Sequence, residues 1–233
     1  MNASRTARER VRAELIREIT EIARRQLATD GATGVSLRAI AREMGMVSSA
    51  IYRYFPSRDD LLTTLIIDGY NAVGAAVEKA EAACPRDDYP GRWLVGCQAV
   101  RGWALAHPHE YALVYGSPVP GYRAPEQTIG PAARAATVFG KIVSDAYRDG
   151  AMTERAACPP LPPSFQPDAA RLREAILADV PDDVTARTVA AWAGLFGLVS
   201  FELFGQFENV VTDRDAFFCF AAPCLGRLAG LPA

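Results

Sequence analysis

Between positions 36 and 58 the chain carries hydroxyl, guanidinium and methyl groups at spacings that suit contact with duplex DNA. Serine hydroxyls can hydrogen-bond to base edges, and an alanine methyl can touch the methyl group of thymine. Tyrosine and arginine side chains are long enough to reach phosphate oxygens. The candidate contacts are Arg38, Ser48, Ser49, Ala50, Tyr52, Tyr54 and Arg58.

Two short helices joined by a glycine turn are expected to position these side chains. Ser36 is a natural N-cap for the first helix, because its hydroxyl can accept a bond from an otherwise unpaired backbone N–H. One apolar stripe then follows at helical spacing, made of Leu37, Ile40, Ala41 and Met44. Gly45 stands where that helix ends, since glycine enters the left-handed region without strain. Ser48 or Ser49 would cap the second helix, which Pro56 ends.

In the second helix, Val47, Ile51 and Phe55 are four residues apart and are expected to face inward. The polar residues between them would then face outward, as in the helix-turn-helix unit that lays its second helix in the major groove. The alternative is an ordinary pair of packed helices with a solvated surface. Exposed tyrosines at positions 52 and 54 favour the DNA interpretation, because they would otherwise lack a partner.

The distribution of charge points the same way, although the net charge of −2 does not. Residues 1–58 hold 11 arginines and 6 acidic residues, a balance of 11 − 6 = +5. The remaining residues hold 14 basic and 21 acidic side chains, a balance of 14 − 21 = −7. A basic N-terminal segment on an acidic body directs that segment towards phosphate.

The run GATGVSLRAIAREMGMVSSAIYRYFPSRDDLL resembles the N-terminal domain of the TetR (tetracycline-repressor-like) family of regulators, and AIYRYFPSRDDLL is its most specific part. The resemblance implies DNA contacts at all seven candidates and at Ser36. It also implies a dimer with a small-molecule site in a C-terminal bundle. A TetR subgroup carries two motifs, Trp-x-x-x-His-Gly and His-Pro-x-x-Tyr. This chain has the second motif at His107-Pro108, and it has the first motif from Trp192 onward except that Phe196 replaces the histidine.

Beyond this segment the sequence predicts an all-α protein of about ten helices, because strand patterns are scarce and proline and glycine separate apolar helical stretches. We expect an N-terminal helix-turn-helix DNA-binding domain at 1–57, with its motif at 36–55. An effector-binding and dimerisation domain would occupy 58–233. Outside the motif, the predicted helices are 6–30, 58–83, 91–106, 110–115, 126–149, 168–179, 182–207 and 213–229. The five prolines within 150–167 predict a long loop.

The predicted helix 182–207 is apolar on nearly every face around Trp192 to Phe204. Such a helix must be covered on all sides. We therefore expect a homodimer through helices about 182–207 and 213–229, joined as a four-helix bundle across a two-fold axis. The alternative is the central helix of a monomeric bundle. Glu202 and Gln206 argue against a membrane span at 189–207.

Aromatic side chains in the C-terminal region are candidates for a ligand pocket, because such pockets are mostly apolar with a few placed polar groups. The candidates are Trp103, His107, Tyr111, Tyr115, Trp192, Phe196 and Phe204. Their chemistry suits an apolar or aromatic effector. No cofactor or metal is expected, since the two histidines are two positions apart and do not share a helix face. A redox role for Cys219 and Cys224 stays open.

These patterns together predict a ligand-responsive repressor that binds a palindromic operator as a dimer and is released by a small molecule. An activator, or a helical binding module without DNA release, is the alternative. An enzyme is not expected, because the chain has no Gly-rich phosphate loop, no Gly-x-Ser-x-Gly and no His-Glu-x-x-His. A cytoplasmic location is expected, since the polar, Arg-rich start lacks the apolar segment of a signal peptide.

Overall fold

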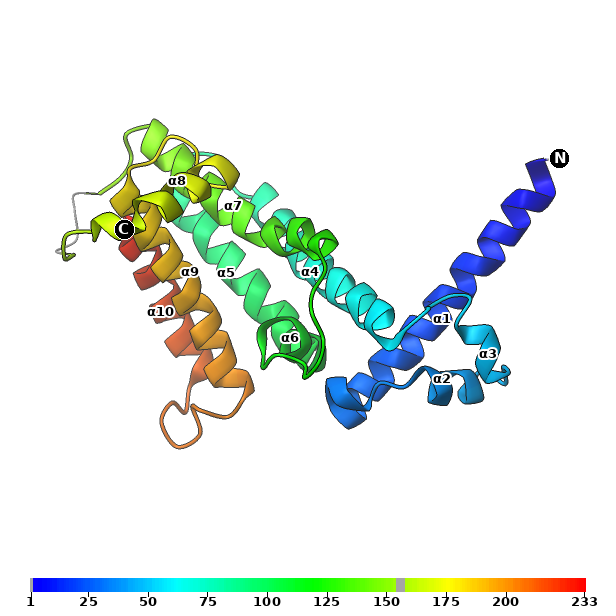
Figure 1. Cartoon of the computed structure of the whole chain (residues 1–233). Coiled ribbons are helices and arrows are strands. Elements are labelled where there is room, and N and C mark those ends of the chain that lie inside the picture. The colour runs from blue at the N-terminus through cyan, green and yellow to red at the C-terminus, as the bar shows by residue number, and fades with distance from the viewer. Residues whose placement is uncertain (1, 154–157) are drawn as a thin grey trace. The chain divides into compact units, whose positions relative to one another are not determined.

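The computed structural model describes residues 2–153 and 158–233, and within them the chain forms ten α-helices, two 3₁₀ turns and no strand (Figure 1). The predicted all-α class is confirmed. The helices are α1 (Asn2–Gly34), α2 (Leu37–Glu43), α3 (Ser48–Ile51), α4 (Arg58–Ala82), α5 (Tyr89–Ala106), α6 (Pro108–Tyr115), α7 (Ile129–Arg148), α8 (Gln166–Ala175), α9 (Asp182–Leu203) and α10 (Arg214–Ala229). The 3₁₀ turns are η1 (Glu126–Thr128) and η2 (Pro163–Phe165).

The chain divides into two compact units, and α4 contributes residues to both. The N-terminal unit is Met1–Gly69 with His107–Ile129, and the C-terminal unit is Tyr70–Ala106 with Gly130–Ala233. The N-terminal unit thus includes α6 in addition to the helices around the predicted DNA-binding motif.

In the N-terminal unit, α1 packs against α2 and α6. Its buried stripe consists of Ile19, Ile22, Ala23 and Leu27, which are spaced so that they share one face of the helix. Gly31 has a φ of +68° and interrupts the helical backbone, close to where the sequence predicts an end. Arg24 joins α1 to the other helices of this unit, with Nη2 2.8 Å from Asp68 Oδ2 and Nε 3.7 Å from Glu110 Oε2.

In the C-terminal unit, α9 packs against α5, α8 and α10, and α10 also packs against α5. Trp93 of α5 lies at the centre of this core: its ring meets Phe139 edge-on at 4.9 Å, and its Nε1 donates to the carbonyl of Ala222 at 3.0 Å. Gly226 lets α10 approach the indole, because a Cβ there would lie 3.0 Å from Trp93 Cδ1. A side chain at position 226 would therefore press on the indole.

Several helix ends differ from the predicted ones. The predicted helix 182–207 ends at Leu203, because the chain turns at Gly205 with a φ of +77°. The predicted helix 168–179 begins earlier, at Gln166, since Pro167 fits the first helical turn, and it ends at Ala175. The predicted loop 150–167 therefore ends before 163, and its residues 154–157 lie outside the described part of the chain.

By length and composition, α9 is the one helix among the described residues that is apolar enough to cross a membrane. Core helices of globular proteins have the same composition, and α9 packs on three other helices. Only 39% of its most apolar stretch is buried within the chain. The sequence predicts that every face of this helix is covered, but a single copy of the chain leaves part of α9 exposed.

A buried ion-pair network joins α4, α5 and α7 within the C-terminal unit. Arg92 is fully buried, with Nε 2.7 Å from Glu81 Oε1 and Nη2 2.8 Å from Asp145 Oδ2. Arg86 also donates to Glu81 Oε1, at 2.7 Å. Burial raises the pKa of Glu81, but the hydrogen bonds from Arg86 and Arg92 outweigh it and hold the pKa below its usual 4.5.

We predict that Arg92→Leu lowers the free energy of unfolding by about 3–5 kcal/mol, because the buried Glu81 and the half-buried Asp145 would each lose their fully buried partner. Among the described residues, only the exposed Arg86 and Arg148 would then remain to pair with these carboxylates. Arg148→Ala is the control: Arg148 also binds Asp145 but is exposed, so its loss should cost less than about 1 kcal/mol. Urea unfolding measures both values. Equal losses in the two variants would contradict the prediction.

The same network should make stability depend on pH. The folded-state pKa of Glu81 lies below the unfolded value of 4.5, so its ion pairs stabilise the fold above that pH. This stabilisation is lost as the pH falls through the folded-state pKa. When the pH falls from neutral to below 4.5, the free energy of unfolding of Arg92→Leu should therefore decrease by less than that of the wild type.

Candidate DNA-binding surface

The start of α2 is fixed by Ser36, as the sequence predicts. Its hydroxyl accepts a hydrogen bond from the Ala39 N–H at 3.4 Å, and its own N–H donates to Gln26 Oε1 of α1 at 3.0 Å. Leu37, Ile40 and Ala41 are buried beneath the helix. The Ser36 hydroxyl is thus occupied by the cap, and a DNA contact from it stays a prediction.

The turn after α2 is also as predicted. Gly45 has a φ of +66°, the left-handed conformation that ends a helix at low cost only for glycine. The Met46 N–H then donates back to the Ala41 carbonyl at 2.8 Å, which reverses the chain towards α3. A helix and a tight glycine turn therefore lead into the segment predicted to contact bases.

The helix α3 is shorter than predicted and differs at its N-terminus. Only Ser48–Ile51 are α-helical, and Val47 is the N-cap without a side-chain hydrogen bond, so the prediction of a serine cap is wrong. The chain continues to Phe55 as turns, with the Tyr54 and Phe55 N–H groups donating to the Ile51 carbonyl. The sequence also predicts that Val47 faces inward, but its extended backbone leaves it 72% exposed.

Ile51 and Phe55 are buried, as predicted, and they anchor α3 and the turn after it. Burial of these two side chains leaves Ser48 and Ser49 exposed, and Tyr52 is 41% exposed. The other two predicted contacts of this segment, Ala50 and Tyr54, are half-buried. The hydroxyl and methyl groups expected to contact DNA therefore lie within one short surface segment.

Arg12 of α1 also belongs to this surface, although no sequence motif indicates it. Its Nη1 donates to the Arg53 carbonyl at 3.3 Å, and its guanidinium carbon lies 5.3 Å from the centre of the Tyr54 ring. The contact spans 41 residues of sequence, so no local pattern could reveal it. The Arg-rich composition of the first residues was the only signal.

The two predicted arginine contacts differ in their surroundings. Arg38 is exposed on α2. Arg58 is only 32% exposed; its Nη2 donates to the Ala32 carbonyl at 2.6 Å and its Nε to the Val35 carbonyl at 3.2 Å. Arg58 thus ties the start of α4 to the connection between α1 and α2, and a phosphate contact from it stays a prediction.

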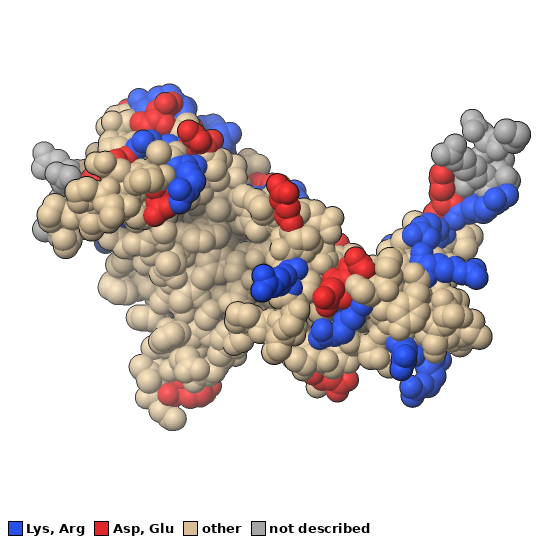
Figure 2. Space-filling model, in the orientation of Figure 1, with Lys and Arg blue, Asp and Glu red and all other residues tan. Residues whose placement is uncertain are grey.

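Positive charge gathers on the same unit. On the face drawn in Figure 2, arginine side chains lie along α1 and beside the α2–α3 turn, while apolar and uncharged residues cover most of the surface between them. Clustered arginine on a unit that also exposes serine and tyrosine hydroxyls is the pattern expected of a surface that contacts the DNA backbone and base edges.

The seven candidate ligand residues are divided between the two units. In the C-terminal unit, the ring centres of Trp192 and Phe196 lie 4.5 Å apart in a tilted arrangement, and Trp192 also meets Phe139 edge-on at 5.5 Å. In the N-terminal unit, Tyr111 and Tyr115 lie 5.1 Å apart.

The remaining three candidates lie apart from these pairs. Trp103 is buried in α5, and Phe204 is 45% exposed at the end of α9. His107 is the N-cap of α6 and its carbonyl accepts the Tyr111 N–H at 2.9 Å, so it ends one helix and begins the next. The pocket role of all seven stays a prediction.

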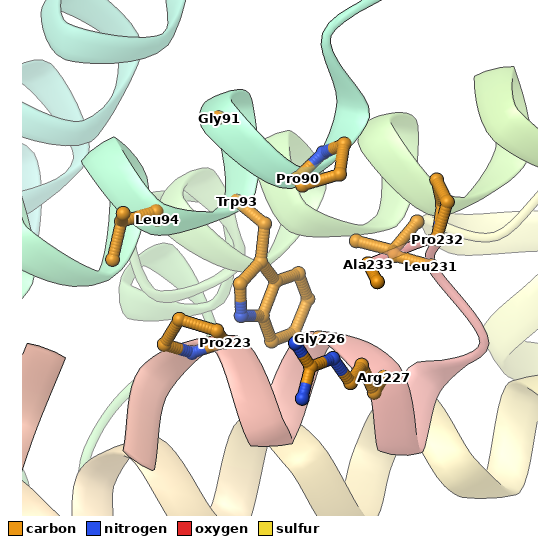
Figure 3. A pocket seen from close by; sticks show the side chains of 10 residues that line it. All are labelled: Pro90, Gly91, Trp93, Leu94, Pro223, Gly226, Arg227, Leu231, Pro232 and Ala233. Atoms are coloured by element: carbon orange, nitrogen blue, oxygen red, sulfur yellow. The ribbon is translucent and has the colours of Figure 1, made fainter. Parts of the chain in front are cut away.

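A cavity of about 130 Å³ opens between the first turn of α5 and the last turns of α10, within the C-terminal unit (Figure 3). It is lined by Pro90, Gly91, Trp93, Leu94, Pro223, Gly226, Arg227, Leu231, Pro232 and Ala233. Its walls are mainly apolar, and none of the seven candidate ligand residues lines it. The cavity therefore lies apart from the predicted pocket.

Comparison with known proteins gives matches over most of the chain. Residues 19–65 match the family model "Bacterial regulatory proteins, tetR family", and residues 93–223 match "Tetracyclin repressor-like, C-terminal domain". The HTH-type transcriptional regulators Rv1816 of Mycobacterium tuberculosis and Mb1846 of Mycobacterium bovis are each 39% identical over 218 residues. These matches cover 92% of this chain and 90% of each relative.

Solved structures give the same result. The putative regulatory protein SCO4313 has a TM-score of 0.76 and 33% identity, covering 93% of this chain and 97% of that one. A protein of unknown function from Rhodococcus sp. RHA1 has a TM-score of 0.69 and 24% identity, over 91% of this chain and 94% of that chain, which is a likeness of fold.

The two arginines should respond differently to removal. We predict that Arg58→Ala lowers the free energy of unfolding by roughly 1–3 kcal/mol, because two carbonyls lose a charged donor. Arg38→Ala, at an exposed position, should change it by no more than about 0.5 kcal/mol. Thermal or urea unfolding measures both. An unchanged unfolding midpoint for Arg58→Ala would show that Arg58 does not stabilise the fold.

Proposed function

Because the chain belongs to the TetR family of transcriptional regulators, we propose that it is a repressor that binds a palindromic operator as a dimer and is released by a small molecule. The family relationship makes it a regulator with a helix-turn-helix DNA-binding domain, and not an enzyme. The observation that carries the DNA-binding role is the exposed hydroxyl surface of Ser48, Ser49 and Tyr52, held in place by the burial of Ile51 and Phe55.

In this proposal residues 1–57 bind DNA. Ser48, Ser49 and Ala50 contact base edges in the major groove, since they lie at the N-terminal end of the second helix of the motif. Tyr52, Tyr54 and the arginines contact phosphates, which fix the register without specifying sequence. Arg38 and Tyr52 suit this role best, because both side chains are exposed.

A homodimer is proposed through α9 and α10. Phe201 on α9 is 52% exposed and Phe220 on α10 is 68% exposed, although both helices are largely apolar. Covering these faces with the same pair of helices from a second copy would make a four-helix bundle. A dimer also meets the needs of DNA recognition, because one short α3 contacts too few base pairs for useful specificity.

Release is proposed to follow from two-state linkage. A ligand lowers DNA affinity if it binds more tightly to the form whose α3 helices are wrongly placed. The loss of DNA affinity equals the ratio of the ligand's affinities for the two forms, which typically corresponds to about 1–3 kcal/mol. The effector is proposed to be apolar or aromatic and to bind within 58–233, near Trp192 and Phe196. The helix α4 would transmit the change, since its residues belong to both units.

The direction of regulation has an alternative, in which ligand binding activates transcription or leaves the protein on DNA. Loss of operator binding on addition of the effector favours the repressor; unchanged or stronger binding favours the alternative. A cytoplasmic location is proposed as well, because the operator lies in the same compartment as the transcription machinery of a bacterial cell.

The tyrosine surface gives a direct test of DNA binding. Tyr52→Phe combined with Tyr54→Ala should weaken binding to duplex DNA by roughly tenfold or more, because two hydrogen bonds to charged phosphates are lost. Tyr147→Phe, at an exposed tyrosine of α7 in the other unit, is the matched control and should bind as the wild type does. Gel-shift titration measures affinity, and circular dichroism checks the fold. Unchanged affinity in the natively folded double variant would show that this surface does not contact DNA.

The proposed dimer has a test of its own. Phe220→Glu should raise the dimer dissociation constant by roughly a hundredfold or more, because a two-fold interface loses two buried phenyl groups at about 1.5–3 kcal/mol each. Ile129→Glu, which alters an equally exposed apolar residue outside α9 and α10, should leave the dimer intact. Light scattering at micromolar concentration distinguishes the 25.1 kDa monomer from its dimer. A monomeric wild type would overturn the proposal.

A further inference from the structure

We propose that the α1 face formed by Arg8 and Arg12, which extends the candidate DNA-binding surface, contacts DNA phosphates outside the base pairs that α3 contacts. The inference rests on the proposed DNA-binding function and extends it to α1. In a dimer, one such contact would lie at each end of the bound duplex. These contacts would depend on charge and on the length of the duplex, and not on its base sequence.

The geometry places this face beside the turn that follows α3. Ala7, Arg8, Val11 and Arg12 of α1 line an open concavity of about 320 Å³ together with Tyr54. Arg12 touches the end of the α3 segment through the Arg53 carbonyl and the Tyr54 ring. A phosphate that Tyr54 contacts would therefore lie close to the α1 arginines.

The charge of this face is not neutralised by its neighbours. Among the described residues, the partners of Arg12 are the Arg53 carbonyl and the Tyr54 ring, and none of their carboxylates pairs with it. Among the described side chains, Arg8 makes neither an ion pair nor a hydrogen bond, and it is exposed. The nearby Glu14 pairs with Arg17 at 3.8 Å. Two guanidinium groups are thus available to an anion beside the DNA-binding segment.

The spacing of the two arginines indicates how far the contact extends. Arg8 lies one helical turn beyond Arg12, about 6 Å along the helix axis at 1.5 Å per residue. Phosphates of one DNA strand follow at about 3.4 Å along the duplex axis. An α1 that continues along the backbone therefore reaches roughly two phosphates past the one next to Tyr54.

Arg10 provides a matched control on the same helix. At about 100° per residue it lies roughly 200° around the helix from Arg8, so it points away from the concavity. It is also exposed and makes neither an ion pair nor a hydrogen bond among the described side chains. Arg8→Ala and Arg10→Ala therefore remove the same charge from the same segment, but only Arg8→Ala removes it from the proposed contact.

The test uses the full-length protein and a duplex that the wild type selects from a random-sequence library, prepared in a trimmed form and in a form extended at both ends. Fluorescence anisotropy measures affinity for both duplexes at several salt concentrations. The wild type should bind the extended duplex more tightly, and Arg8→Ala should lose this gain. The slope of log affinity against log salt concentration should also be shallower for Arg8→Ala, by about 0.9 for each phosphate that the variant no longer neutralises. For one phosphate, the loss of affinity between about 50 and 200 mM salt then becomes roughly 3.5-fold smaller than for the wild type.

The possible outcomes separate this inference from the proposed function. If Arg8→Ala and Arg10→Ala both match the wild type in salt slope and in the gain from extension, the α1 contact does not exist, although DNA binding stands. If both variants lose the gain equally, the effect is one of general charge and the assigned face is wrong. If the wild type selects no duplex at all, the proposed function itself fails.

Discussion

The burial of two side chains, Ile51 and Phe55, is the constraint on which the DNA-binding surface depends. An isolated helix of four residues is not stable, because forming the first helical turn costs more than its hydrogen bonds return. The segment from 48 to 54 keeps its shape because these side chains are held in the core of the N-terminal unit and because Gly45 reverses the chain at low cost. The exposure of the serine and tyrosine hydroxyls follows from this anchoring.

Features that depend on neighbouring residues could be predicted from the sequence. The Ser36 cap, the Gly45 turn and the burial of Leu37, Ile40 and Ala41 on α2 all rest on contacts within a few positions, and the structure has them. Features set by distant residues could not be predicted. Arg58 binds carbonyls more than 20 residues away, and Arg12 reaches Arg53, so neither role leaves a local pattern. The exposure of Val47 and the short α3 likewise follow from how the turn meets the core, which helical periodicity does not describe.

The two units complement each other in the proposed mechanism. A DNA-binding segment as short as α3 needs a second copy to specify a site, and the C-terminal unit carries the exposed phenylalanines that would join two copies. The core of that unit is held by a buried arginine between two carboxylates and by close helix packing at Gly226. A packed core of this kind shifts between discrete arrangements more readily than it deforms, which is what two-state control of DNA binding by a ligand requires.

Selection of bound duplexes from a random-sequence library shows whether the chain binds DNA as a symmetric pair. We expect the wild-type protein to enrich a palindrome whose half-site centres lie a whole number of helical turns apart, the shortest spacing being about 34–36 Å. Enrichment of a single, non-repeated element would contradict the paired arrangement. The absence of any enriched sequence would contradict the claim that this surface recognises DNA.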